Sequence, residues 1–196
     1  MTAGVAPGVG GDDVTVVAER RRFGMWLFLA SLAMLFGGCL VGFVVIRVRA
    51  PEWPPAGSPA LPSEFWLSTV LLVVISALLV VAERAADEGS STRLTRTLSA
   101  ATALGAAFIL SQIAGWARLA GASELPQNNL YLFGVYVLSF LHVLHVAGGL
   151  VPLVWVALRS RGGRYTPTDH EGVTATAMYW HFLGVVWLGI LAVLAL

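Results

Sequence analysis

The sequence predicts an all-α membrane protein that folds as a bundle of five transmembrane helices. Five long apolar runs support this prediction, together with a charged share of only 12% of 196 residues and a mean hydropathy of +0.79. A soluble domain of this size carries about twice that share of charge. The net charge of +1 gives no reason to expect nucleic acid as a partner.

Each apolar run is long enough to cross a bilayer as a helix, which takes roughly 20 residues. Helices are expected because open strands would leave backbone groups unpaired in lipid. The fourth run contains Pro152 after Gly148 and Gly149, so we expect it to tilt or kink there. The predicted spans are residues 23–46, 65–82, 98–119, 130–158 and 175–196.

The twelve basic residues are all arginine, and their distribution predicts the orientation of the chain. Nine lie in the N-terminal tail and in the second and fourth loops, and three lie on the opposite side of the membrane. The cytoplasmic side carries the excess of basic residues, so the N-terminus is expected in the cytoplasm and the C-terminus outside. The nine are Arg20, Arg21, Arg22, Arg84, Arg93, Arg96, Arg159, Arg161 and Arg164, and the three are Arg47, Arg49 and Arg118.

Two regions are predicted along the chain: a flexible cytoplasmic tail over residues 1–22 and the transmembrane domain over residues 23–196. The tail is rich in Gly, Ala and Val and shows no helical or strand period. A signal peptide is a weaker interpretation, because the following run of about 24 residues is too long for its apolar region. Trp53 and Trp66 flank a proline-rich outer loop and suit the interfacial belt, and Cys39 is expected to be a small core residue.

Four polar side chains inside the spans are functional candidates, since such residues are rare in lipid: His142, His145, His181 and Gln112. His142 and His145 lie on one helical face and could ligate a metal or haem iron. At about 1.5 Å per residue, His145 is roughly 20 Å from the inner end of its helix, and His181 only about 9 Å from the inner end of its own. We therefore expect no shared metal site.

The alternative is a hydrogen-bonded seam between helices. Gln112 is about 21 Å from the inner end of its helix, which is level with His145. The depths predict a Gln112–His145 bond between the third and fourth helices, of a kind that contributes on average about 0.6 kcal/mol in membranes. Gly149 extends the stripe of the two histidines and suits close helix contact, and Gly38 and Gly42 form a small-xxx-small pair expected to pack against another helix.

Several motifs resemble subunit III of the haem–copper cytochrome c oxidases, in its short bacterial five-helix form. "FLHVLHVAGGL" (140–150) resembles that family's "FHGLHVxGG", and "YWHFLGVVW" (179–187) resembles its "YWHFVDVVW". "SLAMLFGGCLVGFVVIR" (31–47) resembles "SExMFFAGLFxAYFxxR", and "GAAFILSQIAGW" (105–116) resembles "GxxFLxxQAYEW". The motifs fall on four of the five spans in family order.

The chain departs from the family pattern at three acids, whose positions are occupied by Leu32, Gly115 and Gly184. A function that depends on those carboxylates is therefore not implied by the resemblance. The matching positions, expected at a lipid or subunit interface or in a structural polar seam, are Gln112, Trp116, His142, His145, Tyr179, Trp180, His181 and Trp187. For the Trp180–His181 pair, lipid or subunit contact is favoured over internal packing.

The resemblance implies a non-catalytic subunit of an aa3-type oxidase in the bacterial plasma membrane. In that family, subunit III binds no haem or copper, which lie in partner subunits. It packs on subunit I within a complex that includes subunit II and small subunits, binds phospholipid, and supports stability and proton uptake. The complex oxidises cytochrome c, reduces dioxygen to water and pumps protons, and it is a candidate member of a respiratory supercomplex. The chain is thus expected to act in an enzyme only as part of that complex.

Three other functions remain open at this point. An accessory subunit of a nitric oxide reductase shares the same sequence elements. A small haem b protein that reacts with quinone would use His142 or His145 as a ligand. A transporter is a third class, but we expect a charged residue inside the membrane for coupling, and the predicted spans contain none well inside them.

Overall fold

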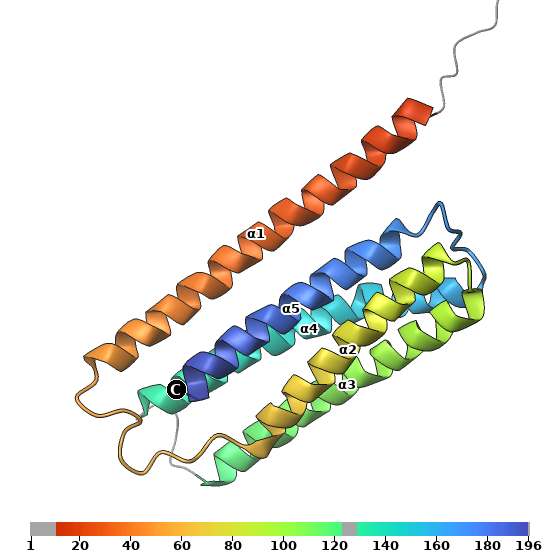
Figure 1. Ribbon diagram of the computed structural model, residues 1–196. Coiled ribbons are helices and arrows are strands. Elements are labelled where there is room, and N and C mark those ends of the chain that lie inside the picture. The colour runs from red at the N-terminus through yellow and green to blue at the C-terminus, as the bar shows by residue number, and fades with distance from the viewer. Residues whose placement is uncertain (1–10, 123–128, 196) are drawn as a thin grey trace, which may run out of the picture.

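The computed structural model describes residues 11–122 and 129–195, which form five α-helices (Figure 1). Within the described residues the only bridge of β type is an isolated one between Thr166 and Asp169. All five helices are long and apolar enough to cross a membrane, which confirms the predicted all-α, five-helix membrane fold. In chain order the helices are α1 (Gly11–Arg49), α2 (Ser63–Asp87), α3 (Ser91–Ala122), α4 (Leu130–Arg161) and α5 (Glu171–Ala195).

The helices extend beyond the predicted apolar spans at several ends. α1 begins at Gly11 and not at Phe23, so residues 11–22, which lie in the predicted tail, are helical. The sequence between Gly11 and Gly24 has no proline that would remove a backbone donor, so the helix can continue into the polar segment. The apolar part of α1, Arg22–Arg49, begins close to the predicted boundary, and residues 1–10 lie outside the described residues.

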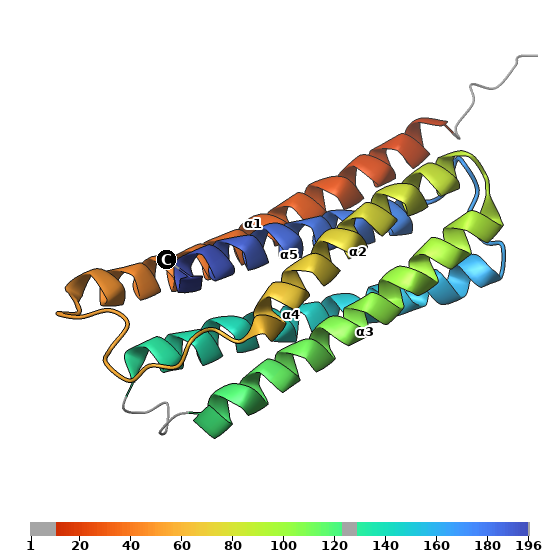
Figure 2. The ribbon, with the colours of Figure 1, turned by 60° about the horizontal axis from the view of Figure 1, so that its bottom comes forward.

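The helices pack in an order that differs from their order in the sequence. α2 and α3 form a tight antiparallel pair on one side of the bundle, and α4 and α5 lie between this pair and α1 (Figures 1 and 2). Gly89, with a φ of +69°, allows the short turn between α2 and α3. Within the described part of the chain, α1 packs only on α4 and α5.

α1 buries one apolar stripe and leaves the opposite face exposed. Leu29, Leu32, Phe36 and Phe43 follow helical spacing and are all less than 10% exposed. A Cβ atom added at Gly38 or Gly42 would meet nothing within 4 Å. The small-xxx-small pair therefore takes no part in packing among the described residues, contrary to our prediction, because the buried stripe of α1 is built from large side chains.

Glycines on the other helices do allow close approach. The ring of Phe43 on α1 lies against Gly134 of α4, and the ring of Tyr179 on α5 lies against Gly149 of α4. A Cβ atom on Gly105 of α3 would lie 2.9 Å from Cη2 of Trp180. The prediction that Gly149 supports close helix contact is confirmed, since α4 and α5 meet at its surface.

The helical assignment of α4 runs without a break through Pro152. At the N-terminal end of α4 Asn129 caps the helix: its Oδ1 accepts hydrogen bonds from the backbone N–H groups of Tyr131 and Leu132 at 3.0 and 3.2 Å. Trp53, in the loop between α1 and α2, is half-buried between the rings of Phe43 and Tyr131, at centroid distances of 5.4 and 5.7 Å. The proline-rich loop is thereby held against α1 and α4.

We predict that Gly149→Leu separates α4 from α5, because the new side chain would occupy the position of the Tyr179 ring. The expected cost is about 1–3 kcal/mol, as for other overpacked cores. Gly148→Leu is the matched control, since a Cβ at Gly148 meets nothing within 4 Å and the change should be within about 0.5 kcal/mol. Thermal unfolding in detergent measures both, and equal midpoints would contradict the described contact.

Candidate functional site

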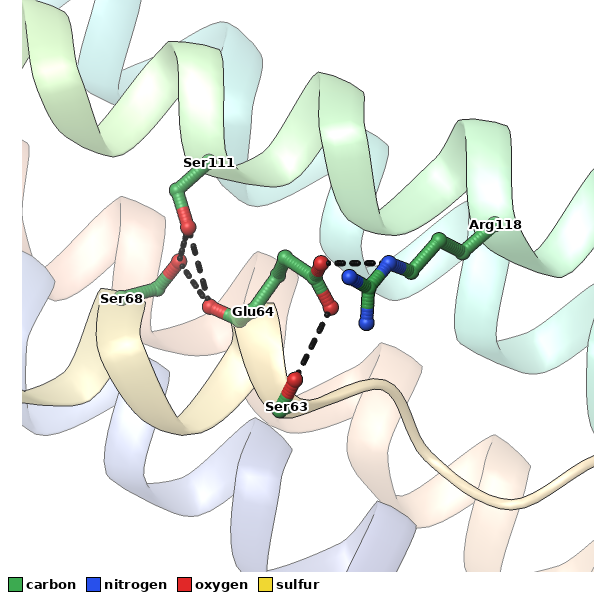
Figure 3. Close-up of polar contacts among 5 residues, drawn as sticks. All are labelled: Ser63, Glu64, Ser68, Ser111 and Arg118. Carbon is green, nitrogen blue, oxygen red and sulfur yellow. Dashed lines mark hydrogen bonds and ion pairs between the residues drawn. The ribbon is translucent and has the colours of Figure 1, made fainter.

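The clearest polar cluster of the bundle lies where α2 begins and α3 ends (Figure 3). The Glu64 carboxylate of α2 forms an ion pair with the Arg118 guanidinium of α3, with 2.8 Å between Glu64 Oε1 and Arg118 Nε. The Glu64 side chain is 13% exposed and that of Arg118 is 67% exposed. The ion pair therefore bridges the two helices at the edge of the apolar layer, where solvent screening of the interaction is partial.

Below the ion pair, two serines and one glutamine are buried between the same helices. Ser68 and Ser111 donate hydrogen bonds to the backbone carbonyl of Glu64 at 2.8 and 3.1 Å (Figure 3). Gln112 Nε2 donates to Ser68 Oγ at 2.7 Å, and Gln112 is fully buried. The predicted Gln112–His145 bond is therefore wrong: helical rise gives the depth of Gln112, but the side chain turns toward α2 and not toward α4.

Gly115 lies beside this cluster, at a position where the resembling family has a glutamate. A Cβ atom on Gly115 would lie 3.0 Å from Cε2 of Phe65 and 3.4 Å from Cβ of Glu64. The Cβ atom of a side chain at position 115 would thus lie in contact with the Cβ atom of Glu64. The carboxylate of this region comes from α2, and the glycine on α3 leaves the space that Glu64 and Phe65 use.

The next polar contacts join α3 to α4. Trp116 Nε1 donates to Ser139 Oγ at 2.9 Å, and Ser139 Oγ donates to the carbonyl of Val135 at 2.6 Å. The Tyr136 hydroxyl donates to the carbonyl of Trp116 at 3.2 Å. Ser139 is fully buried and Trp116 is half-buried. Trp116, one of the predicted site residues, thus has a partner on the neighbouring helix.

His142 is enclosed by aromatic rings and has no exposed surface. Ring centroids of Phe36, Phe108 and Trp187 lie 6.1, 5.7 and 5.1 Å from that of His142, so α1, α3 and α5 all contribute to the enclosure. Neither ring nitrogen has a hydrogen-bond partner among the described residues. Both ring nitrogens are themselves buried within the bundle. Trp187 is fixed in turn by its Nε1 donor bond to Thr69 Oγ1 at 3.0 Å.

His145, one turn further along α4, has contacts with α1 and α5. Its Nδ1 lies 2.7 Å from the carbonyl of Leu141 in the same helix, and its ring centroid lies 5.0 Å from that of Phe36. The Tyr179 hydroxyl donates to the carbonyl of His145 at 2.9 Å. The two histidines thus share the ring of Phe36, while α5 is joined to the backbone of α4 at His145.

Trp180 and His181 are neighbours in the sequence but belong to different environments. Trp180 is 1% exposed, and its Nε1 donates to the carbonyl of Gly149 at 3.2 Å. This favours internal packing for Trp180, in place of the expected lipid or subunit contact. His181 is half-buried, and its Nδ1 lies 2.8 Å from Ser76 Oγ of α2.

The two other positions of missing family acids also lie in apolar or small surroundings. Leu32 is 7% exposed and belongs to the buried stripe of α1. A Cβ on Gly184 would lie 3.9 Å from Ser76 Oγ, beside a pocket of about 230 Å³ between α2 and α5. Across residues 11–122 and 129–195, no group of three or more His, Cys, Asp or Glu side chains is arranged to hold a metal ion.

A family model for cytochrome c oxidase subunit III matches residues 5–195. The chain belongs to the cytochrome c oxidase subunit III family. It is 31% identical over 172 residues to cytochrome c oxidase subunit 3 of Synechocystis, a match that covers 87% of this chain and 72% of the relative. Identity to the probable subunit 3 of Nocardia farcinica is 29%, with 86% and 84% covered, and to the pig (Sus scrofa) protein 32%, with 91% and 70% covered.

Several polar residues of this subunit III bundle were missed by sequence reasoning. Glu64 directly precedes the predicted span that begins at residue 65, so it was assigned to the loop. Arg118 lies at the end of the span that ends at residue 119, and it was used only to predict the orientation. The serines gave no signal because such hydroxyls usually bond to the carbonyl of their own helix. Among the missed residues with partners on other helices are Glu64, Ser68, Thr69, Ser76, Ser111, Arg118 and Ser139.

We predict that Ser68→Ala destabilises the α2–α3 pair by about 1 kcal/mol, because the buried Gln112 amide loses its acceptor. Ser63→Ala is the matched control: Ser63 is exposed, and its hydroxyl makes only a 3.4 Å contact with the Glu64 carboxylate. Resistance to thermal unfolding in detergent measures both variants. Equal loss in the two would show that the buried Gln112–Ser68 bond contributes nothing measurable.

Proposed function

We propose that the chain is a non-catalytic subunit III of an aa3-type cytochrome c oxidase in a bacterial plasma membrane. The single observation that supports this most strongly is the subunit III family match across residues 5–195 of a five-helix membrane bundle. Similarity to cytochrome c oxidase subunits 3 of several bacteria favours an oxidase over the nitric oxide reductase alternative. The histidines support a structural role, since His142 is enclosed by rings and His181 bonds to Ser76.

In this proposal the haem and copper centres belong to partner subunits, with subunit I as the main partner and subunit II and small subunits in the same complex. Electron transfer from cytochrome c, reduction of dioxygen and proton pumping take place there. The contribution of this chain is to stabilise subunit I and to support proton uptake. Its polar side chains suit that role because they join helices to one another, as Trp116 joins Ser139 and Tyr179 joins His145.

Phospholipid is the proposed ligand of this chain, held where α1 stands away from the rest of the bundle. A groove of about 620 Å³ between α1 and α5 is lined mainly by apolar side chains, among them Trp26, Leu29 and Phe182. A second groove of about 460 Å³ runs past Pro152 and Trp155 on α4. Acyl chains suit such apolar walls, because the transfer of an acyl chain into the groove costs little free energy.

The proposal is tested by purification of the tagged chain in mild detergent, followed by identification of the membrane subunits that remain bound. We expect the large haem-containing subunit and a copper-containing subunit at equal amounts. A Soret band from the chain freed of all partners would overturn the non-catalytic assignment. Co-purification with a nitric oxide reductase in place of an oxidase would overturn the oxidase assignment alone.

We predict that His145→Ala weakens retention of subunit I or of phospholipid and leaves the haem spectrum of the oxidase unchanged. The His145 ring contacts Phe36 of α1. Loss of that contact is expected to loosen α1, which forms one wall of the lipid grooves. Leu144→Ala is the matched control, because Leu144 is 57% exposed on the same turn of α4. Phospholipid content per haem measures the effect, and a changed haem or copper signal on full assembly would contradict the prediction.

We also predict that the N-terminus lies in the cytoplasm, as the arginine distribution indicates. In a Cys39→Ser background, Ala56→Cys in the outer loop should react with a membrane-impermeant maleimide on intact cells. Thr92→Cys, in the first turn of α3, should react only after the cells are made permeable. Both positions are exposed in the structure, so the reverse pattern would show the opposite orientation.

A further inference from the structure

A pocket of about 230 Å³ opens between α2 and α5, which lie side by side in the bundle (Figure 1). Its rim carries exposed apolar side chains, Val73 of α2 and Val185 and Leu188 of α5. Gly184 of α5 keeps the space open, since only Ser76 Oγ lies within 4 Å of a Cβ atom placed there, at 3.9 Å. This α2–α5 pocket is therefore open toward the surroundings of the chain.

The polar side chains that line the α2–α5 pocket form two pairs. In the first pair, Trp187 Nε1 donates to Thr69 Oγ1 at 3.0 Å, and Thr69 Oγ1 donates to the carbonyl of Phe65 at 3.0 Å. The N–H of the indole and the O–H of the threonine are thus both used within the chain. This pair has no donor left to offer to a molecule in the pocket.

The second pair, Ser76 with His181, keeps one donor unused. Nδ1 of His181 lies 2.8 Å from Oγ of Ser76, and both residues are half-buried. If the Ser76 hydroxyl donates this bond, the neutral imidazole carries its hydrogen on Nε2; if Nδ1–H donates, the hydroxyl hydrogen of Ser76 is left over. Within residues 11–122 and 129–195 neither side chain forms another hydrogen bond, so either arrangement leaves one donor without an acceptor.

The Ser76–His181 pair lies deep in the apolar layer. His181 is ten residues from the start of α5 at Glu171, and Ser76 is eleven residues from the end of α2 at Asp87. At about 1.5 Å per residue, each is roughly 15 Å or more from the nearer end of its helix, which is half of an apolar layer of about 30 Å. The head groups of phospholipids lie outside this layer and do not reach the pair.

The chemistry of the pocket selects among the molecules that could fill it. An acyl chain suits the apolar rim but has no acceptor for the unused donor. A water molecule takes about 30 Å³ and needs about two to four polar partners, whereas this pocket is several times larger and offers one donor. A side chain with an oxygen acceptor fills the volume and satisfies the donor, and at this depth such a side chain belongs to a transmembrane helix.

We propose that the α2–α5 pocket is a docking site for a transmembrane helix of subunit I. This helix inserts a side chain with an oxygen acceptor (serine, threonine, asparagine or glutamine) against the Ser76–His181 pair, and its apolar surface packs on the rim. The naming of subunit I as the partner rests on the proposed function. The lipid groove between α1 and α5 also borders His181 and Val185, so the bound lipid lies at the edge of this interface.

Photo-crosslinking in the assembled complex tests where the partner lies. p-Benzoylphenylalanine takes the place of Val185 on the rim, which is 69% exposed, or of Leu110 on α3, which is 67% exposed and does not line the pocket. After irradiation of membranes, the tagged chain is purified and its adducts are identified by mass spectrometry. We expect an adduct with subunit I at position 185 and none at position 110.

The failures of this experiment are distinguishable. An adduct of position 185 with lipid alone, in a preparation that still contains subunit I, would overturn the docking site and leave the proposed function standing. Adducts with subunit I at position 110 in place of position 185 would do the same. Absence of subunit I from preparations of the unmodified chain would overturn the proposed function and, with it, the named partner.

Gly184→Leu fills the pocket from within the chain, and its Cβ meets only Ser76 Oγ, at an ordinary contact distance. We expect the amount of subunit I that stays bound through a detergent wash to fall on the order of tenfold, because an overpacked contact costs about that factor or more. Gly42→Leu is the matched control, since a Cβ there meets nothing within 4 Å. Undiminished binding of subunit I by Gly184→Leu, or an equal loss in both variants, would overturn the docking site.

A double variant, Ser76→Ala with His181→Phe, tests the hydrogen bond separately from the shape of the pocket. It removes both donors and keeps an apolar pair of similar size. We expect bound subunit I to fall about threefold, the factor that corresponds to an average hydrogen bond between helices in membranes. Ser31→Ala is the control, because the exposed Ser31 hydroxyl donates to a carbonyl of its own helix. Binding equal to that of the control would overturn the assignment of an acceptor side chain to the pocket.

Discussion

The rest of the bundle depends on α2, whose side chains supply hydrogen bonds to both of its neighbours. Toward α3 it presents Glu64 and Ser68, and toward α5 it presents Thr69, Ser76 and Glu83. Between helices in lipid there is no gain from excluding water, so packing and such bonds hold the helices together. α3 and α5 are therefore both bonded to α2, and α4 is bonded to α3 and α5 in turn.

The two histidines of α4 that match the family motif have different surroundings in the structure. His142 and His145 of α4 contact the same ring, that of Phe36, but one is enclosed by aromatic side chains and the other supports the α1 interface. Of the three positions that lack family acids, Gly115 lies directly beside Glu64. α2 itself carries carboxylates at Glu64 near one end and at Glu83 near the other.

The sequence was sufficient for the helices but not for the contacts between their side chains. The five spans were predictable because lipid requires long apolar runs and allows little else. The level of Gln112 was predictable from helical rise, but its partner was not, since rise gives depth and leaves the direction around the axis open. Glu64 was not predicted as a site residue because a charged residue at the end of a span is usually assigned to the loop. Trp180 was predicted at an interface because an amphipathic ring suits an interface and an interior equally well.

The peripheral place of α1 has a consequence for how the protein is made. The ribosome produces this helix first, yet the partners on which it packs, α4 and α5, are the last to enter the membrane. During synthesis α1 stays as a separate helix in lipid until α4 is in the membrane, because its contacts through Phe36 and Phe43 are made with α4. Truncation before α5 would therefore leave the earliest segment of the chain without most of its native neighbours, which makes the final helix the step that commits the whole polypeptide to its structure.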